Sequence, residues 1–94
     1  MTTLDDVFAT IEDRKVHPKE GSYVNRLLSV GPEAVHEKIA EESAEVIEAS
    51  QQFGPKEIIH ETADVLFHLC VLLAAHNLTL QQVYDELQRR QKPR

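Results

Sequence analysis

The sequence predicts an all-α protein, and three observations lead to that fold class. Apolar residues recur at helical spacing, as in Leu4, Val7, Phe8 and Ile11. Three glycines and four prolines in 94 residues, with 5% aromatic residues, suit helices better than a sandwich or a barrel. We find no stretch that alternates apolar and polar residues as a half-buried strand would. A chain of this length makes one domain, so we expect a single helical domain over residues 1–94.

Capping residues and a Gly-Pro pair mark the first two expected helices. Thr3 is placed to cap the first helix, and the basic segment 14–21, which contains a proline and a glycine, is expected to be a linker. Ser22 is placed to cap a short second helix. Gly31-Pro32 then ends that helix and begins a third, because proline is well tolerated at the first helical position.

The third and fourth helices should form an antiparallel pair. We expect the third to run to about Phe53, where Gly54-Pro55 closes it and opens the fourth. The fourth should continue to about His76, with Asn77 as its C-cap. Such a short connection places the two helices side by side and antiparallel.

The last part of the chain predicts a fifth helix and a subunit interface. Thr79 and Gln82 form a capping-box pattern, and residues 89–94 are expected to be a flexible tail. Residues 65–75, in the fourth helix, are apolar on nearly every side and must be covered all round. One small chain offers too little surface for that, so we expect a homodimer or a larger homo-oligomer.

Composition excludes several classes of partner. A formal net charge of −6 argues against a nucleic-acid backbone, which needs a basic surface. One cysteine cannot form an internal disulfide, and the chain opens with the polar residues MTTLDD. The longest apolar run, residues 65–75, is too short to cross a bilayer. We therefore expect a soluble cytoplasmic domain with no nucleic-acid or membrane partner.

A carboxylate interrupts the apolar stripe of the third expected helix. The stripe follows helical spacing through five residues, Val35, Ile39, Val46, Ala49 and Phe53. The position that belongs between the second and third of them is occupied by Glu42. A helix has no structural reason to place a carboxylate on the face that it buries.

Two acidic pairs should face each other across the hairpin. Glu42 and Glu45 are spaced i, i+3, and so are Glu61 and Asp64. The first pair lies about eleven residues before the turn and the second about eight after it. The offset of about three residues corresponds to about 4.5 Å along a helix, less than one turn.

A divalent cation would explain this arrangement. Ionised carboxylates turned toward an apolar seam repel one another and lose solvation. Ligation by carboxylates alone selects a hard ion, Mg²⁺ or Mn²⁺ as its substitute. Lys38, one turn before Glu42, could meet phosphate charge brought by such an ion. The alternative is an ordinary solvated acidic surface with an ordinary surface lysine.

A redox di-iron site is the competing metal hypothesis. It needs two Glu-x-x-His pairs that face each other, and the chain has Glu33/His36 and Glu57/His60. The first pair is far from the Gly-Pro turn and the second is close to it. The hairpin would hold them at opposite ends, so they cannot share a metal within one chain.

The acidic motif resembles that of a known enzyme superfamily. Glu41-Glu42-x-x-Glu45 followed by Glu61-x-x-Asp64 is similar to the EExxE…ExxD signature of the all-α, MazG-like nucleoside-triphosphate pyrophosphohydrolases. Three further stretches narrow the resemblance from the superfamily to one family. They are GSYVNRLL at 21–28, KIAEESAEVIEA at 38–49 and HETADVLFHLCVLL at 60–73. With them the chain resembles, over almost its whole length, the phosphoribosyl-ATP pyrophosphohydrolases of histidine biosynthesis.

The resemblance implies a fold, a reaction and roles for five residues, and the position of Lys38 one turn before Glu42 suggests a role for a sixth. It implies a MazG-like bundle, completed by dimerisation, that hydrolyses the α–β phosphoanhydride of 1-(5-phosphoribosyl)-ATP with Mg²⁺. The products are the AMP derivative and pyrophosphate. Four residues would be metal ligands, Glu42, Glu45, Glu61 and Asp64. Glu41 would be the base that orients the water or a group outside the ligand set, and Lys38 would meet substrate phosphate. The basic residues 14, 15, 19 and 26 precede the acidic site, and one or two could also reach phosphate.

Two other functions remain open at this point. The same fold and metal chemistry could act on an ordinary or damaged nucleoside triphosphate, as a pool-cleansing enzyme. Alternatively, the chain could be a non-catalytic helical dimerisation module whose acidic residues only solvate a groove. Substrate turnover discriminates among the three.

Overall fold

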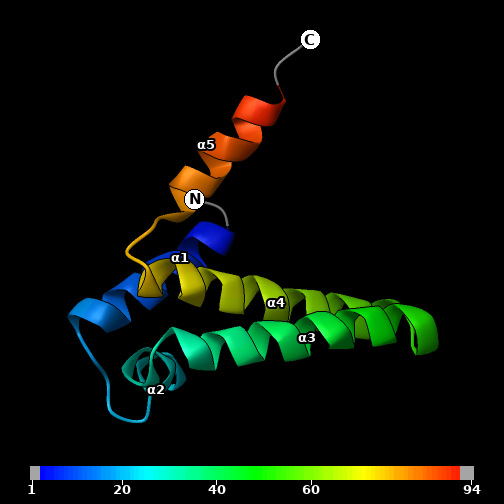
Figure 1. Cartoon of the computed structure of the whole chain (residues 1–94), viewed down its shortest axis with the longest axis horizontal. Coiled ribbons are helices and arrows are strands. Elements are labelled where there is room, and N and C mark those ends of the chain that lie inside the picture. Colours follow the sequence, from blue (N-terminus) through cyan, green and yellow to red (C-terminus); the bar gives the residue numbers. More distant parts are fainter. Residues whose placement is uncertain (1–2, 92–94) are drawn as a thin grey trace.

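The computed structural model describes residues 3–91, and these residues form five helices and no strand. The helices are α1 (Thr3–Val16), α2 (Tyr23–Val30), α3 (Pro32–Gln52), α4 (Pro55–Ala75) and α5 (Leu80–Arg90) (Figure 1). The predicted all-α fold class is confirmed. α5 ends at Arg90, inside the segment expected as a tail, and residues 92–94 lie outside the described residues.

The predicted N-caps of α2 and α5 are present. The Ser22 side chain accepts a hydrogen bond from the Asn25 backbone N–H at 3.2 Å. The Thr79 hydroxyl accepts from the Gln82 backbone N–H at 3.1 Å, and the Gln82 side chain accepts from the Thr79 N–H at 2.8 Å. This reciprocal pair satisfies two backbone donors that the first turn of α5 leaves free.

Two helix ends differ from the expectation. α1 continues through Val16, three residues into the segment expected as a linker, because Arg14 and Lys15 suit the negative end of the helix dipole. At the end of α4 the C-cap is His76, and Asn77 is the next residue, with a φ of 58°. Asparagine tolerates this left-handed conformation, which closes the helix with the Leu78 N–H donating to the Leu73 carbonyl at 2.9 Å.

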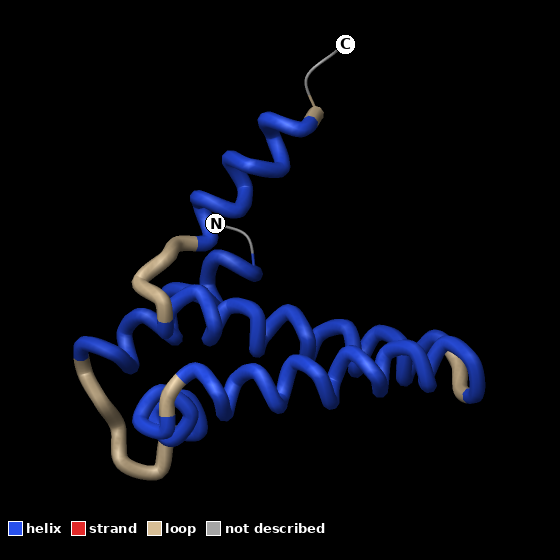
Figure 2. Tube along the Cα trace, viewed as in Figure 1, coloured by secondary structure: helices blue, strands red, loops and turns tan. Residues whose placement is uncertain are grey.

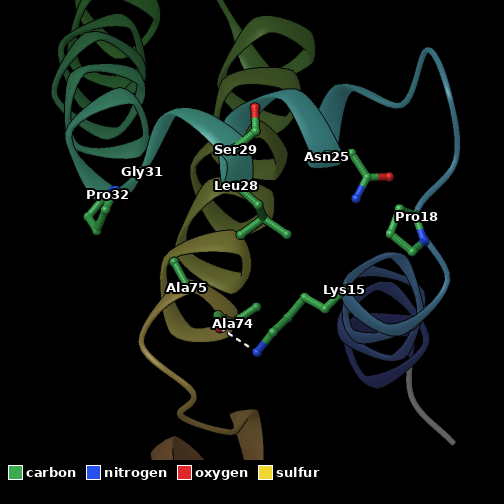
Figure 3. A pocket seen from close by; sticks show the side chains of 9 residues that line it. All are labelled: Lys15, Pro18, Asn25, Leu28, Ser29, Gly31, Pro32, Ala74 and Ala75. Atoms are coloured by element: carbon green, nitrogen blue, oxygen red, sulfur yellow. Dashed lines mark hydrogen bonds between the residues drawn. The ribbon is translucent and has the colours of Figure 1, made fainter.

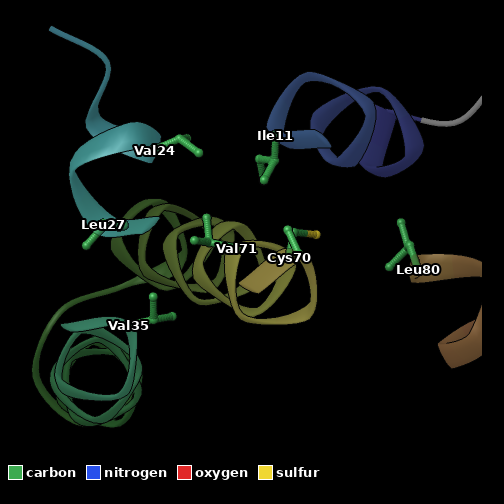
Figure 4. Packing of buried hydrophobic residues seen from close by; sticks show 8 residues of the cluster. Ile11, Val24, Leu27, Val35, Cys70, Val71 and Leu80 are labelled. Atoms are coloured by element: carbon green, nitrogen blue, oxygen red, sulfur yellow. The ribbon is translucent and has the colours of Figure 1, made fainter. Parts of the chain in front are cut away.

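The α3–α4 hairpin is the longest feature of the fold. The two helices run side by side and antiparallel, joined at Gly54 (Figures 1 and 2). The buried core gathers at the end of the hairpin far from that turn, where the other helices meet it (Figure 4). Its members are Ile11, Val24, Leu27, Val35, Cys70, Val71, Ala74 and Leu80. The remainder of the hairpin, toward Gly54, has large apolar side chains exposed at Ile47, Phe53 and Ile59.

α4 is the most apolar helix of the described part of the chain. By length and composition alone, its 21 residues are sufficient to cross a membrane. The sequence-based expectation differed because it considered only the shorter apolar run at residues 65–75. A single helix of this kind is weak evidence for a membrane span, because the core helix of a soluble protein passes the same test. α4 packs along α3 and carries Glu61 and Asp64, and 22% of its apolar window is buried in this structure.

Candidate metal centre

Three of the four expected ligands meet between α3 and α4. Glu42, Glu45 and Glu61 each place one carboxylate oxygen within 4.8 Å of the other two. Glu42 and Glu45 lie on one face of α3, and Glu61 faces them from α4 because the hairpin is antiparallel. Glu42 is buried, with 7% of its surface exposed, whereas Glu45 and Glu61 are half-buried. We call these three residues the acidic cluster.

Asp64 joins the acidic cluster through Glu61. Ligand atoms of His60, Glu61 and Asp64 also lie within 4.8 Å of one another, and Glu61 belongs to both groups. The His60 Nε2 is 3.6 Å from the Asp64 Oδ2. His60 was not among the expected site residues. Its i, i+4 spacing from Asp64 was the signal, since that spacing puts two side chains on one helix face.

Crowding of carboxylates shifts two pKa values upward. The neighbouring Glu45 carboxyl is the main cause that raises the pKa of Glu61 to about 7, because two carboxyls that share a proton are favoured over two that repel. Burial is the second cause. For Glu42 burial is the largest cause of a raised pKa, and Glu45 and Asp64 add to it. Without a cation, the acidic cluster therefore favours protonated carboxyl groups over a full set of ionised carboxylates.

The donor set fits a hard divalent cation. Glu42 Oε2 and Glu61 Oε2 are buried and have no hydrogen-bond partner. An ionised carboxylate only accepts, so nearby carboxylates cannot satisfy these atoms unless they are protonated. A cation satisfies both oxygens and removes the repulsion. An all-oxygen set of this kind is typical of Mg²⁺ or Mn²⁺ sites.

A cleft opens beside the acidic cluster on the side of the hairpin turn. Its volume is about 340 Å³, and its lining residues are Glu45, Glu48, Ala49, Phe53, Glu57 and Glu61. The cleft contains two members of the acidic cluster and adds two exposed carboxylates and one exposed aromatic ring. A ligand that enters it would reach Glu45 and Glu61 directly.

Lys38 and Glu41 lie outside both groups of potential ligands. They pair with each other on α3, with 3.9 Å between the Lys38 Nζ and the Glu41 Oε1. Their side chains are 34% and 56% exposed. Lys38 precedes Glu42 by one helical turn, and Glu41 is its immediate neighbour. Both side chains are accessible from solvent, and each lies one helical turn before a member of the acidic cluster, Lys38 before Glu42 and Glu41 before Glu45.

A buried histidine connects the site to α2. The His68 Nδ1 is 2.9 Å from the backbone carbonyl oxygen of Asp64, and its Nε2 is 2.8 Å from the Tyr23 hydroxyl. His68 is 5% exposed, so both contacts satisfy a polar group inside the protein. The sequence placed His68 one turn after Asp64 but gave no indication of Tyr23, because that contact joins residues 45 positions apart.

A further cleft lies at the other end of the hairpin. Its volume is about 540 Å³, and Lys15 reaches across it from α1 to the Ala74 carbonyl at 2.7 Å (Figure 3). The same Nζ donates to the Asn77 side chain at 2.9 Å. None of the six residues given a role in the reaction lines this cleft, and of the basic residues that could reach phosphate it contains Lys15. Lys15 there neutralises the carbonyl end of α4.

Comparison with known proteins identifies the family of this chain. The family model described as phosphoribosyl-ATP pyrophosphohydrolase matches residues 4–91. This chain belongs to the phosphoribosyl-ATP pyrophosphohydrolase family. It is 50% identical over 91 residues to a phosphoribosyl-ATP pyrophosphatase of Methanocella arvoryzae, covering 95% of this chain and 96% of that protein.

Other members of the family include longer proteins. The phosphoribosyl-ATP pyrophosphatase of Methanococcoides burtonii is 47% identical over 92 residues, which is 96% of this chain and 93% of that protein. The histidine biosynthesis bifunctional protein HisIE of Caldanaerobacter subterraneus is 42% identical over 89 residues, but these make up 43% of its length. The family domain thus occurs alone and as part of a bifunctional chain.

Proposed function

We propose that this protein hydrolyses phosphoribosyl-ATP to phosphoribosyl-AMP and pyrophosphate, the second step of histidine biosynthesis. The observation that carries the proposal is the acidic cluster, in which buried carboxylate oxygens meet without a partner in a chain that matches the family over residues 4–91. The bond that breaks is the α–β phosphoanhydride. The substrate is a small phosphoribosyl nucleotide, and the cytoplasm is the compartment that we assign.

We assign the metal to four side chains, Glu42, Glu45, Glu61 and Asp64. Their oxygens would hold Mg²⁺, with Mn²⁺ as a substitute, because both are hard ions that prefer oxygen ligands. When bound, the ion supplies positive charge that neutralises phosphate oxygens and polarises a phosphoryl group. His60 beside Asp64 limits how that carboxylate can turn.

Glu41 and Lys38 would act on the substrate from outside the ligand set. Glu41 is exposed, so its carboxylate can orient a water molecule and accept its proton. Lys38 is a cation one turn before Glu42 and would meet a phosphate oxygen of the substrate. Their mutual contact at 3.9 Å is a weak surface pair, which a phosphate can displace at little cost.

We further propose that the working protein is a homodimer at least. An apolar cleft of about 330 Å³ lies between α4 and α5, and its lining includes Leu66, Leu69, Val83 and Leu87. α5 projects away from the hairpin (Figure 1), and these four side chains are exposed. Exposed leucines that continue the apolar run of α4 are best covered by the same surface of a second copy, as a two-fold dimer requires.

Pyrophosphate release tests the proposed function. Phosphoribosyl-ATP is compared with ordinary nucleoside triphosphates, each with Mg²⁺ and with EDTA. We expect turnover of phosphoribosyl-ATP in Mg²⁺ only, at a higher kcat/KM than any ordinary triphosphate. Preference for an ordinary triphosphate would assign the protein to pool cleansing instead. Absence of turnover on every substrate would identify a non-catalytic module.

A further inference from the structure

Of the four basic side chains considered before the acidic cluster, two already make structural contacts and one has no contact that orients its charged group. Arg14 pairs with Asp13 at 3.0 Å. Lys15 holds the end of α4. The Lys19 backbone N–H donates to the Asn25 side chain, but no contact orients the Lys19 ammonium group. Arg26 is therefore the cation of this region to consider as a ligand-binding group.

Arg26 is charged and exposed, and it pairs with no carboxylate of residues 3–91. Of the other described arginines, Arg14 pairs with Asp13, and Arg89 and Arg90 both pair with Glu86. The Arg26 guanidinium instead lies over the Tyr23 ring, with its central carbon 5.5 Å from the ring centroid. Contact with a ring face orients a guanidinium and leaves its N–H donors free.

Tyr23 is itself fixed to α4 by three contacts. Its hydroxyl is 2.8 Å from the His68 Nε2, its ring stacks on Phe67 at 6.2 Å, and it meets the His68 ring edge-on at 5.8 Å. Because the Asp64 carbonyl only accepts, His68 Nδ1 carries the proton toward it. In the neutral ring, Nε2 then accepts the Tyr23 O–H.

These contacts form a continuous chain from Arg26 to α4, the helix that carries Glu61 and Asp64. The guanidinium contacts the Tyr23 ring, Tyr23 bonds to His68, and His68 bonds to the turn of α4 that carries Asp64. We propose that Tyr23 and His68 are positioning residues that hold α2 in register with this site, and that Arg26 is thereby presented as a phosphate-binding residue. The inference rests on the proposed function, because the ligand is taken to be a phosphorylated nucleotide.

Phosphoribosyl-ATP offers two sources of phosphate to Arg26. One is the triphosphate, which contains the bond that breaks, and the other is the phosphate of the added ribose. Arg26→Gln distinguishes them. If Arg26 binds the triphosphate, the variant should bind inorganic pyrophosphate with Mg²⁺ about tenfold more weakly by calorimetry. If it binds the ribose phosphate, pyrophosphate binding should stay constant while the preference for phosphoribosyl-ATP over ATP falls about tenfold.

In either case Arg26→Gln should raise KM for phosphoribosyl-ATP with kcat little changed, because the contact is the same before and during reaction. Arg26→Lys should restore part of the loss, since it returns the charge without the planar fork. Binding of Mg²⁺ alone and the melting temperature should not change, because Arg26 is exposed and touches no expected ligand. The matched control is Arg14→Gln, which removes the same charge from an arginine that is already paired.

Tyr23→Phe tests the positioning role. It keeps the ring under Arg26 but removes the hydroxyl that bonds to His68. KM should rise, by less than in Arg26→Gln, and the double variant should show no further rise, because both changes act through one guanidinium. The proposal is overturned if Arg26→Gln leaves both pyrophosphate affinity and substrate preference intact, or if Arg14→Gln has an equal effect. The pyrophosphate titration needs no turnover, so it stays informative if the proposed reaction fails.

Discussion

At the scale of single residues, Glu42 connects the folding of α3 to the chemistry of the site. It was recognisable from sequence because it occupies an apolar position of a regular helical stripe. The structure buries it to 7% exposure with one oxygen unpartnered. His60 and Tyr23 could not be assigned in the same way, because their roles depend on how side chains meet and, for Tyr23, on packing between separate helices.

Glu42→Gln separates a metal ligand from a surface glutamate. Glutamine keeps the shape and removes the charge, so repulsion in the acidic cluster falls. The metal-free protein should be as stable as the wild type or slightly more so, while turnover in saturating Mg²⁺ falls by orders of magnitude. Melting in EDTA and a turnover assay measure the two effects. Glu37→Gln, an exposed position of the same helix, should change stability by at most about 0.5 kcal/mol and leave turnover intact.

Glu61 predicts the pH dependence of the metal-free protein. Its pKa is raised from 4.5 to about 7 in the folded state, so between these values the folded chain holds more protons than the unfolded chain. Stability in EDTA should therefore be greatest at low pH in this window and fall as pH rises from 4.5 to about 7. Mg²⁺ affinity should rise over the same range, because the ion competes with the proton.

Denaturant unfolding in EDTA at several pH values checks the Glu61 effect. The side chain introduced by Glu61→Gln does not titrate, so the stability of this variant should fall less than that of the wild type as pH rises from 4.5 to about 7. An equal fall in the two proteins would mean that another group carries the pH dependence.

At the scale of helices, local signals predicted most boundaries. Ser22, Thr79 and the two Gly-Pro pairs gave starts that the structure confirms, because each acts through nearby backbone groups. The end of α1 was placed too early, because segment 14–21 looked like one basic linker. Lys15 in fact stabilises the last turn of α1 and bonds to the end of α4, a contact between residues 59 positions apart.

The uncovered surface of α4 predicts the oligomeric state. Leu69 is 38% exposed and lines the apolar cleft between α4 and α5. Leu69→Glu should convert the dimer to a monomer by light scattering at micromolar concentration, because it would bury a charge in an apolar contact. Val16→Glu changes an exposed apolar residue outside that cleft and should leave the dimer intact. A monomeric wild-type protein would contradict the proposed interface.

At the scale of the whole molecule, the fold separates stability from chemistry. The core lies where the other helices meet the hairpin, and the acidic cluster lies farther along the hairpin, toward Gly54. The division follows the sequence, because apolar residues concentrate in 65–75 whereas Glu61 precedes that segment. The relation of α5 to the rest was not predictable, since only Leu80 of its apolar side chains is buried in the core, whereas Val83 and Leu87 are exposed in one chain.

The central claim is that the acidic cluster is a cation site, and the effect of Mg²⁺ on melting temperature tests it most directly. A cation that binds only the folded state stabilises it by mass action, and here it also relieves repulsion among Glu42, Glu45 and Glu61. We expect a higher melting temperature in Mg²⁺ than in EDTA, with a smaller difference in Glu42→Gln. Identical wild-type melting curves in Mg²⁺ and EDTA would contradict the claim.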